Sequence, residues 1–211
     1  MYKNVIKRII DLALSFLGVI ILLPVFIIVS VLIYIDDPGP VFFKQKRIGK
    51  NKKIFWLHKF RSMKMNTPDI PTHLLDNPEQ YITRVGRVLR LLSIDELPQI
   101  YDILLGRMAI IGPRPALWNQ YDLIAERDKY GANDIKPGLT GWAQINGRDE
   151  LPIDIKAKFD GEYTEKLNDG GFTAFTMDLK CFFGTIIKVL KHEGVAEGTA
   201  EKTTEKEVVH R

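Results

Sequence analysis

The segment that decides the fold lies near the start of the chain and reads IIDLALSFLGVIILLPVFIIVSVLIYI over residues 9–35. As a helix this run of about 27 residues would be ~40 Å long, whereas the hydrocarbon core of a bilayer is ~30 Å thick. It is too long for the apolar region of a cleaved signal peptide, and no small-x-small cleavage site follows it. Asp11, its only charged residue, is expected to pair with Lys7 or Arg8 one helical turn away. The segment predicts an element inserted in a membrane.

The topology of this element depends on Pro24, which stands in the middle of the run. Proline removes one backbone hydrogen bond and clashes with the carbonyl four positions earlier, here that of Ile20. Two topologies follow: a kinked helix that spans the membrane, or a helix–break–helix that enters and leaves by the same face. Basic residues flank the run on both sides and favour a cytoplasmic location for both flanks, namely Lys3, Lys7, Arg8, Lys44, Lys46, Arg47, Lys50, Lys52 and Lys53. A single span does not fit this pattern, yet the residues alone leave both topologies open.

The whole chain has 211 residues, a formal charge of +4 and a pI of about 9.0. This length suits one domain with a modest core and an accessory element. The basic balance favours an anionic partner, with nucleic acid, anionic lipid and phosphorylated substrates all open at this level. The lone cysteine, Cys181, excludes an internal disulfide framework, fits a reducing compartment and is expected to be a buried, inert thiol.

Short elements are expected after the apolar run. Val41–Phe43 and Ile54–Leu57 flank a lysine-rich tip, a pattern that predicts a small basic β-hairpin. Apolar periodicity and turn residues predict helices over residues 77–92, 94–105, 116–129, 153–167 and 173–191. The last of these has a wide apolar face, which fits either the core or the bilayer surface, with partial membrane contact slightly favoured.

The most informative polar stretch is Ser93-Ile94-Asp95-Glu96-Leu97-Pro98. One interpretation is structural, with Ser93 and Glu96 forming an S-x-x-E capping box at the start of the predicted helix. The other is chemical, because a helix N-terminus attracts phosphate and a carboxylate can attack phosphorus to form an acyl phosphate. Local physics alone favours the cap. Asp95 and Glu96 nevertheless stand as the candidate catalytic pair.

Attack on phosphorus requires cations that offset phosphate charge. The chain offers Lys59, Arg61, Arg90, Arg114 and Arg148. Each alone is most simply a solvated surface charge, but together, near glycines and prolines that fix backbone shape, they support the phosphate interpretation. The sequence has no G-x-x-x-x-G-K-[ST] loop, no G-x-G-x-x-G and no D-x-D pair, and its four histidines lack metal-site spacing.

Five ordered motifs make the chain similar to the bacterial sugar transferase family, the small monotopic phosphoglycosyl transferases that begin glycan assembly on polyprenol phosphate. The motifs are Pro40-Val41-Phe42-Phe43-Lys44-Gln45, Lys59-Phe60-Arg61-Ser62-Met63, Ser93-Ile94-Asp95-Glu96-Leu97-Pro98-Gln99, Ile111-Gly112-Pro113-Arg114-Pro115 and Pro137-Gly138-Leu139-Thr140-Gly141-Trp142-Ala143-Gln144-Ile145-Asn146-Gly147-Arg148. The resemblance implies a re-entrant membrane helix broken at Pro24, with both ends in the cytoplasm. Members close to the bacillosamine phosphate transferase carry Ser-Pro at the break, where this chain has Leu23-Pro24.

The resemblance also implies a two-step reaction. Asp95 attacks the β-phosphorus of a UDP-sugar, UMP leaves, and polyprenol phosphate then takes the sugar phosphate from the aspartate. Mg²⁺ bridges Asp95 and the diphosphate, while Glu96 orients groups or supports the metal. The residues expected to bind phosphate or substrate are Lys59, Arg61, Arg90, Arg114, Arg148 and Gln144. No residue pattern specifies the sugar.

These inferences predict an α+β, mainly α fold with interfacial amphipathic helices. Its parts would be a re-entrant membrane helix (1–40), a cytoplasmic catalytic domain on the membrane surface (41–193) and a disordered charged tail (194–211). The expected location is the cytoplasmic face of the bacterial inner membrane, with UDP-sugar, polyprenol phosphate and the bilayer as partners and a homodimer left open. The rival hypothesis is a membrane-tethered, non-enzymatic protein that binds anionic lipid. A nucleic-acid binder is disfavoured, because the basic residues adjoin the membrane element rather than a reading helix.

Overall fold

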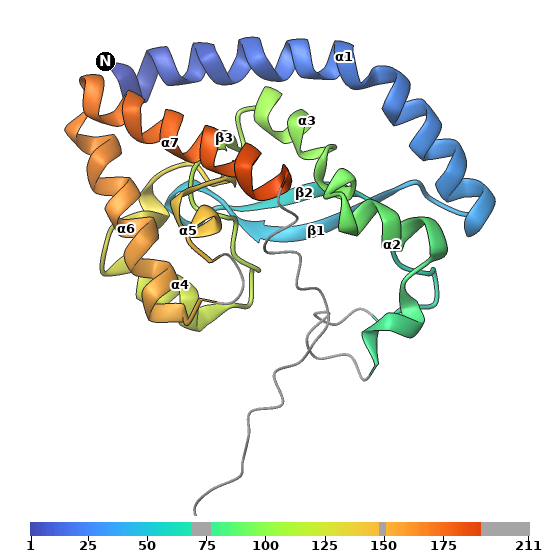
Figure 1. The fold of residues 1–211 in the computed structure, drawn as a ribbon. Helices are drawn as coiled ribbons and strands as arrows, with labels where there is room; N and C mark the ends of the chain where they lie inside the picture. The colour runs from blue at the N-terminus through green and yellow to red at the C-terminus, as the bar shows by residue number, and fades with distance from the viewer. Residues whose placement is uncertain (69–76, 148–150, 191–211) are drawn as a thin grey trace, which may run out of the picture.

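The computed structural model describes residues 1–68, 77–147 and 151–190. Within these residues helices dominate beside two small sheets, so the predicted α+β, mainly helical class is confirmed. Helix α1 (Lys7–Asp36) arches over one side of the molecule, and the other elements lie beneath it (Figure 1). The predicted tail, residues 194–211, lies outside the described residues.

The predicted β-hairpin is confirmed and is longer than expected. Strands β1 (Phe42–Ile48) and β2 (Ile54–Phe60) pair antiparallel, and the turn between them contains a short 3-10 helix, η2 (Lys50–Lys52). A second sheet was not predicted: β3 (Ala109–Ile111) pairs in parallel with β4 (Gly138–Thr140). These two strands bring the segments around residue 112 and residue 140 together.

The remaining helices differ from the sequence prediction mainly in the first half of the chain. The single helix expected over residues 77–92 is interrupted, because Ile82 is extended and the Thr83 hydroxyl accepts a hydrogen bond from Gly86 N (2.9 Å), which caps a new helix. The helix expected over residues 116–129 is shorter, whereas the last two are confirmed nearly to their predicted bounds. The observed helices are η4 (Pro78–Tyr81), α2 (Arg84–Leu91), η5 (Ile94–Glu96), α3 (Gln99–Leu104), α4 (Tyr121–Asp128), η6 (Ala132–Asp134), α5 (Trp142–Ile145), α6 (Ile153–Asp169) and α7 (Gly171–Leu190).

Helix α1 follows a π-helical turn, η1 (Tyr2–Ile6), and runs without interruption through Pro24. The predicted break is therefore a bend: the backbone stays helical, while the ribbon changes direction along its length (Figure 1). A proline that removes one hydrogen bond can bend a helix without ending it. The segment Tyr2–Asp36 has a mean hydropathy of 3.2 and is long enough to cross a membrane. Only 11% of its most apolar part is buried, unlike the core helix of a soluble protein.

The N-terminal end of this segment is fixed to α7 by polar contacts. Asp178 accepts hydrogen bonds from the Tyr2 hydroxyl (2.7 Å) and from Lys7 Nζ (2.8 Å). Asp11 also has a partner that the sequence did not predict, because its Oδ1 accepts a hydrogen bond from the backbone N of Ile110 at 3.0 Å. These contacts bind the start of the apolar segment to the folded domain.

The C-terminal end of α1 packs against a different part of the same domain. Val29 and Ile33 join a buried cluster with Phe60 of β2 and Leu89 of α2. Beyond them, Asp36 Oδ2 accepts a hydrogen bond from the backbone N of Val85 at 2.8 Å, close to the start of α2. Both ends of the apolar segment therefore contact one folded unit.

Helix α7 has a core side and an exposed side. Ala174 and Cys181 are fully buried in a cluster with residues of α6 and η1, whereas Phe183 and Ile187 are 56% and 53% exposed. One face of α7 therefore belongs to the core, and large apolar side chains remain exposed on the other face, while the partial membrane contact expected for this helix stays a prediction.

Candidate active site

Asp95 and Glu96 lie in a single 3-10 turn, η5, and not in the first turn of a long helix. The predicted capping box is wrong, because the Ser93 side chain makes no capping bond and the next helix, α3, begins only at Gln99. Ser93 has a left-handed backbone (φ 54°), which lets the chain reverse directly after α2, and its N–H bonds to the carbonyl of Arg90 (3.0 Å). The turn therefore begins at a residue with a left-handed backbone, and the side chain of that residue does not cap it.

Apolar neighbours anchor this turn. Ile94 and Leu97, on either side of the acidic pair, pack against the cluster that contains Phe60. As a result Asp95 and Glu96 are only 5% and 8% exposed. Carboxylates that are buried to this degree require cationic or hydrogen-bonding partners, and the structure supplies them.

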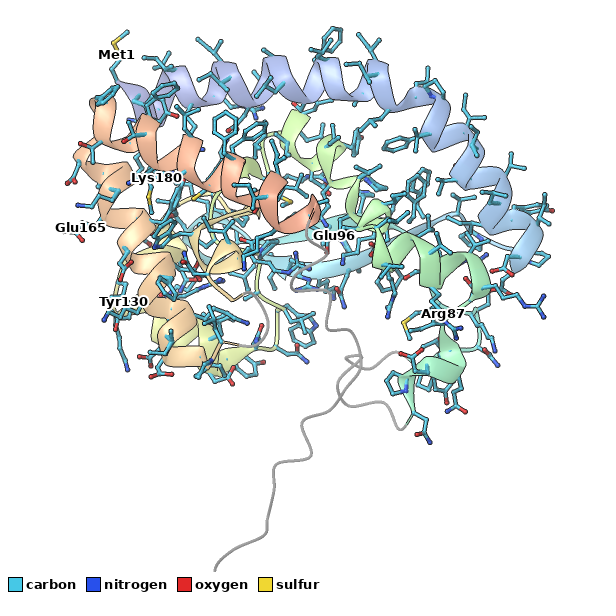
Figure 2. The ribbon with its side chains drawn as sticks, viewed as in Figure 1. Met1, Arg87, Glu96, Tyr130, Glu165 and Lys180 are labelled. Carbon is cyan, nitrogen blue, oxygen red and sulfur yellow. The ribbon has the colours of Figure 1, made fainter. Side chains whose placement is uncertain are left out.

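Glu96 is held by two cations. Arg114 donates to both carboxylate oxygens, from Nη2 to Oε1 (2.5 Å) and from Nη1 to Oε2 (3.1 Å), while Lys59 Nζ donates to Oε1 (2.9 Å). Figure 2 shows Glu96 near the centre of the molecule, beside the hairpin that carries Lys59. The fork-shaped pairing with Arg114 fixes the orientation of the carboxylate.

Asp95 is bound less tightly to the same lysine. Its Oδ2 lies 3.8 Å from Lys59 Nζ, which is within ion-pair range but is longer than a hydrogen bond. Lys59 therefore bridges the two acids while bonding strongly to one of them. Lys59 and Arg114 together engage both oxygens of Glu96, and Lys59 also offsets the charge of Asp95.

The loop that carries Arg114 is fixed by two further arginines, which the sequence analysis did not single out. Arg127 Nη1 donates to the Arg114 carbonyl (2.9 Å), and Arg47 Nη1 donates to the Pro115 carbonyl (2.9 Å). Arg127 is itself paired with Asp160 of α6 (Nη2 to Oδ2, 2.5 Å), and both side chains are almost completely buried. Burial raises the pKa of the Asp160 carboxyl, while the charge of Arg127 opposes the shift. No local motif marks these residues, because the pair forms between separate helices.

The other predicted substrate-binding residues have contacts of their own. Arg61 pairs with Asp37 (Nη1 to Oδ2, 3.2 Å), just after α1, and its Nε is a buried donor without a hydrogen bond among the described residues. The remaining contacts are Arg90 Nε to Ser62 Oγ (2.9 Å) and Gln144 Nε2 to the Leu139 carbonyl (3.0 Å). Arg148 lies outside the described residues. The contacts thus join Lys59 and Arg114 to the acidic pair, while Arg61 bonds to Asp37 and Gln144 to the Leu139 carbonyl.

Asp95 is the acid of the pair that would hold Mg²⁺, the metal that the resemblance implies. Mg²⁺ is usually held by one or two carboxylates together with water and substrate phosphates, rather than by a complete protein cage. Three hydrogen bonds from Lys59 and Arg114 already engage both oxygens of Glu96, which makes Glu96 a poor metal ligand. Across the described residues no group of three His, Cys, Asp or Glu side chains could form a protein cage.

Known proteins of one family are similar to this chain. A family model described as bacterial sugar transferase matches residues 2–192. The uncharacterized sugar transferase EpsL of Bacillus subtilis (strain 168) is 36% identical over 203 residues, which are 95% of this chain and 96% of the relative.

Two larger relatives have names that state a reaction. The UDP-glucose:undecaprenyl-phosphate glucose-1-phosphate transferase of Escherichia coli (strain K12) is 36% identical over 88% of this chain and 40% of the relative. The undecaprenyl-phosphate galactose phosphotransferase of Salmonella typhimurium is 31% identical over 90% of this chain and 41% of the relative. The chain spans about two fifths of these two proteins but nearly the whole length of EpsL. With its match extending over almost all of its length, the chain belongs to the bacterial sugar transferase family.

Proposed function

We propose that the chain is a membrane-bound phosphoglycosyl transferase that moves a sugar 1-phosphate from a UDP-sugar to polyprenol phosphate. Relatives named as undecaprenyl-phosphate glucose and galactose phosphotransferases support this substrate class. The observation that carries the proposal is the buried pair of acids Asp95 and Glu96, which Lys59 bridges and in which Arg114 clamps Glu96. The names of the relatives give no support to the rival, non-enzymatic interpretation.

Asp95 is the nucleophile in this proposal. An oxygen of Asp95 attacks the β-phosphorus, the bond between that phosphorus and the oxygen of UMP breaks, and UMP leaves with the electron pair. Glu96 is a poorer candidate because hydrogen bonds from Lys59 and Arg114 engage both of its oxygens. Lys59, 3.8 Å from Asp95, is placed to offset negative charge on the phosphoryl group.

In the second step a phosphate oxygen of polyprenol phosphate attacks the sugar-phosphoryl aspartate and releases the Asp95 carboxylate. The acceptor is an anion at neutral pH, so the step needs no strong general base. Mg²⁺ held by Asp95 would supply charge neutralisation for the diphosphate. Glu96 then has a positioning role, since it keeps Lys59 and Arg114 beside the reacting group.

The membrane topology in the proposal is re-entrant. Tyr2 and Lys7 at one end of the apolar segment, and Asp36 at the other, bond to the same folded domain. A straight span would carry one of these ends across the bilayer and away from its partners. A bent helix that returns to the cytoplasmic face keeps both sets of contacts and places Asp95 near the depth of a lipid phosphate.

The test of the reaction is a panel of UDP-sugars with undecaprenyl phosphate and Mg²⁺, scored for UMP release by the full-length protein. One or more sugars should give UMP with the wild type, and Asp95→Asn should abolish release. With a UDP-sugar labelled in the β-phosphate and no acceptor, label should stay on the wild-type chain but not on Asp95→Asn. If no UDP-sugar yields UMP, the transferase proposal fails. If UMP forms without retained label, direct transfer replaces the covalent route.

A further inference from the structure

A second polar cavity lies on the other face of the hairpin from the acidic pair. Its volume is about 380 Å³, and its lining residues are Lys44, Trp56, His58, Tyr101 and Arg107. Successive side chains of a strand point to opposite faces, so His58 faces away from its neighbour Lys59, which bonds to Glu96. The cavity is therefore distinct from the proposed catalytic site.

The floor of the cavity is built on a fully buried carboxylate. Asp102 of α3 accepts from the backbone N of His58 (2.9 Å), and its Oδ1 lies 2.9 Å from His58 Nδ1. A carboxylate only accepts, so Nδ1 carries the proton and Nε2 is the ring atom left for a ligand. Arg107 Nη1 also reaches Asp102, at 3.3 Å. Asp102 thus fixes both His58 and Arg107.

The lining chemistry selects an anionic ligand at an interface between water and lipid. Lys44 and Arg107 supply positive charge, and among the described residues no acidic side chain lines the cavity. Trp56 and Tyr101 are 49% and 52% exposed. Such amphipathic rings concentrate at the headgroup level of membranes, where Lys and Arg side chains attract phosphate groups.

The position of the cavity agrees with the depth of lipid headgroups in the membrane. Arg8, the last cation before the apolar segment, donates to the carbonyls of Ile103 (2.6 Å) and Leu104 (2.9 Å) at the end of α3. Tyr101 lies on the same short helix, and Arg107 follows it by three residues. The cavity is therefore beside the point where α1 would enter the bilayer, given the proposed topology.

We propose that this cavity binds the phosphate-bearing headgroup of a membrane lipid, with Lys44 and Arg107 contacting the phosphate and Trp56 and Tyr101 lying at the level of the adjoining glycerol or chain. The phosphate has two sources, a phosphomonoester such as a polyprenol phosphate or the phosphodiester of an anionic phospholipid. The proposal assigns no chemistry to the cavity. Asp95→Asn should retain lipid binding, so failure of the proposed reaction and failure of this site can be told apart.

The test is calorimetric titration of the full-length protein in neutral detergent with dodecyl phosphate, short-chain phosphatidylglycerol, inorganic phosphate and UMP. Lys44→Gln/Arg107→Gln should bind the lipid ligands about thirtyfold more weakly than the wild type. Each cation near an anionic headgroup contributes to the free energy of binding, and this variant lacks two of them. The matched control is Lys50→Gln/Lys53→Gln at the hairpin tip, which removes equal charge outside the cavity and should bind as the wild type does. Arg107→Lys keeps the positive charge at this position, so this variant should bind the lipid ligands nearly as tightly as the wild type.

The ligands separate the outcomes. Preference for dodecyl phosphate assigns the monoester lipid, and preference for phosphatidylglycerol assigns the bulk phospholipid; either supports the site. Inorganic phosphate or UMP binding as tightly as the lipids, with the same loss in the double variant, would overturn the assignment to lipid. Equal weakening in the two double variants would also overturn it, because a diffuse surface charge would then account for binding. Unchanged melting temperatures check that each variant is folded.

Discussion

At the scale of single residues, the two neighbouring acids differ in the contacts that Lys59 and Arg114 make with them. Glu96 receives three hydrogen bonds from Lys59 and Arg114, and the same lysine lies 3.8 Å from Asp95. The two acids are adjacent in the sequence, and the motif alone does not indicate which of them has which role. The geometry shows that Lys59 and Arg114 fix the Glu96 carboxylate, and our proposal gives Glu96 the positioning role and Asp95 the role of nucleophile.

The fork-shaped contact between Arg114 and Glu96 predicts that lysine is a poor substitute for this arginine. Arg114→Lys keeps the charge but cannot donate to Oε1 and Oε2 together. Loss of one charge-assisted hydrogen bond should lower kcat about ten- to a hundredfold in the UMP-release assay, with a smaller effect on the KM for UDP-sugar. Arg87→Lys, at a side chain that is 70% exposed, is the matched control and should leave the rate unchanged. Equal rates for the two variants would contradict the clamp.

A second prediction concerns Arg127, which holds the Arg114 carbonyl and pairs with buried Asp160. Arg127→Met leaves the Asp160 carboxylate without its cation, and such a loss costs about 3–5 kcal/mol. Thermal unfolding in detergent should show a large drop in melting temperature. Arg127→Met/Asp160→Leu removes both charges and should recover much of the stability but not the activity, because the Arg114 carbonyl remains unheld. Full recovery of both stability and activity would mean that the pair of Arg127 and Asp160 stabilises the core but does not position Arg114.

At the scale of secondary structure, the glycine-rich motif is explained by close backbone contact. A Cβ on Gly141 would lie 2.1 Å from the Gly112 carbonyl oxygen, and one on Gly138 would lie 2.1 Å from the Gly112 N. Gly141 has an extended backbone (φ −174°), so space rather than conformation demands glycine there. The parallel strands β3 and β4 can meet only if these positions have no side chain.

Gly141→Ala should therefore separate β4 from the segment that leads to Arg114. Overpacking of this kind typically costs about 1–3 kcal/mol, and displacement of the loop should also reduce UMP release. Gly18→Ala is the control, since its Cβ would meet only Ile100 Cδ1 at an ordinary 3.5 Å. Thermal unfolding and the rate of UMP release measure the two effects. A Gly141→Ala protein as stable and active as Gly18→Ala would refute the explanation.

The sequence predicted the elements whose signal is local. The hairpin and helices α6 and α7 follow from alternation and from helical periodicity over long segments. The second sheet could not be predicted, because each strand has three residues and its partner lies nearly thirty positions away. The prediction of a capping box was wrong because Ser93 adopts a left-handed backbone, which the residue type serine does not indicate. At the site, the motif indicated Asp95, Glu96, Lys59 and Arg114, but the supporting pair of Arg127 and Asp160 depends on helix packing that no local pattern encodes.

At the scale of the whole molecule, the bent helix α1 and the domain beneath it behave as one unit. Asp178 binds the first turns of the apolar segment, while Val29 and Ile33 pack with Phe60 and Leu89 near its end. Between these contacts, large apolar side chains of the helix face outward. A protein built in this way can insert the outer face of its arch into one leaflet while both ends stay with the domain.

The re-entrant topology predicts that single cysteines at the two ends of α1 react from the same side of the membrane. Asn4→Cys and Pro40→Cys, both at exposed positions, should be labelled by a charged maleimide only when the cytoplasmic face of sealed vesicles is accessible. Ile21→Cys, in the apolar part of the helix, should react only after denaturation. The native Cys181 adds little background, because it is fully buried and burial raises the pKa of its thiol to about 12. Labelling of positions 4 and 40 from opposite faces would establish a spanning helix, and the contacts that join both ends to one domain would then have to break in the membrane.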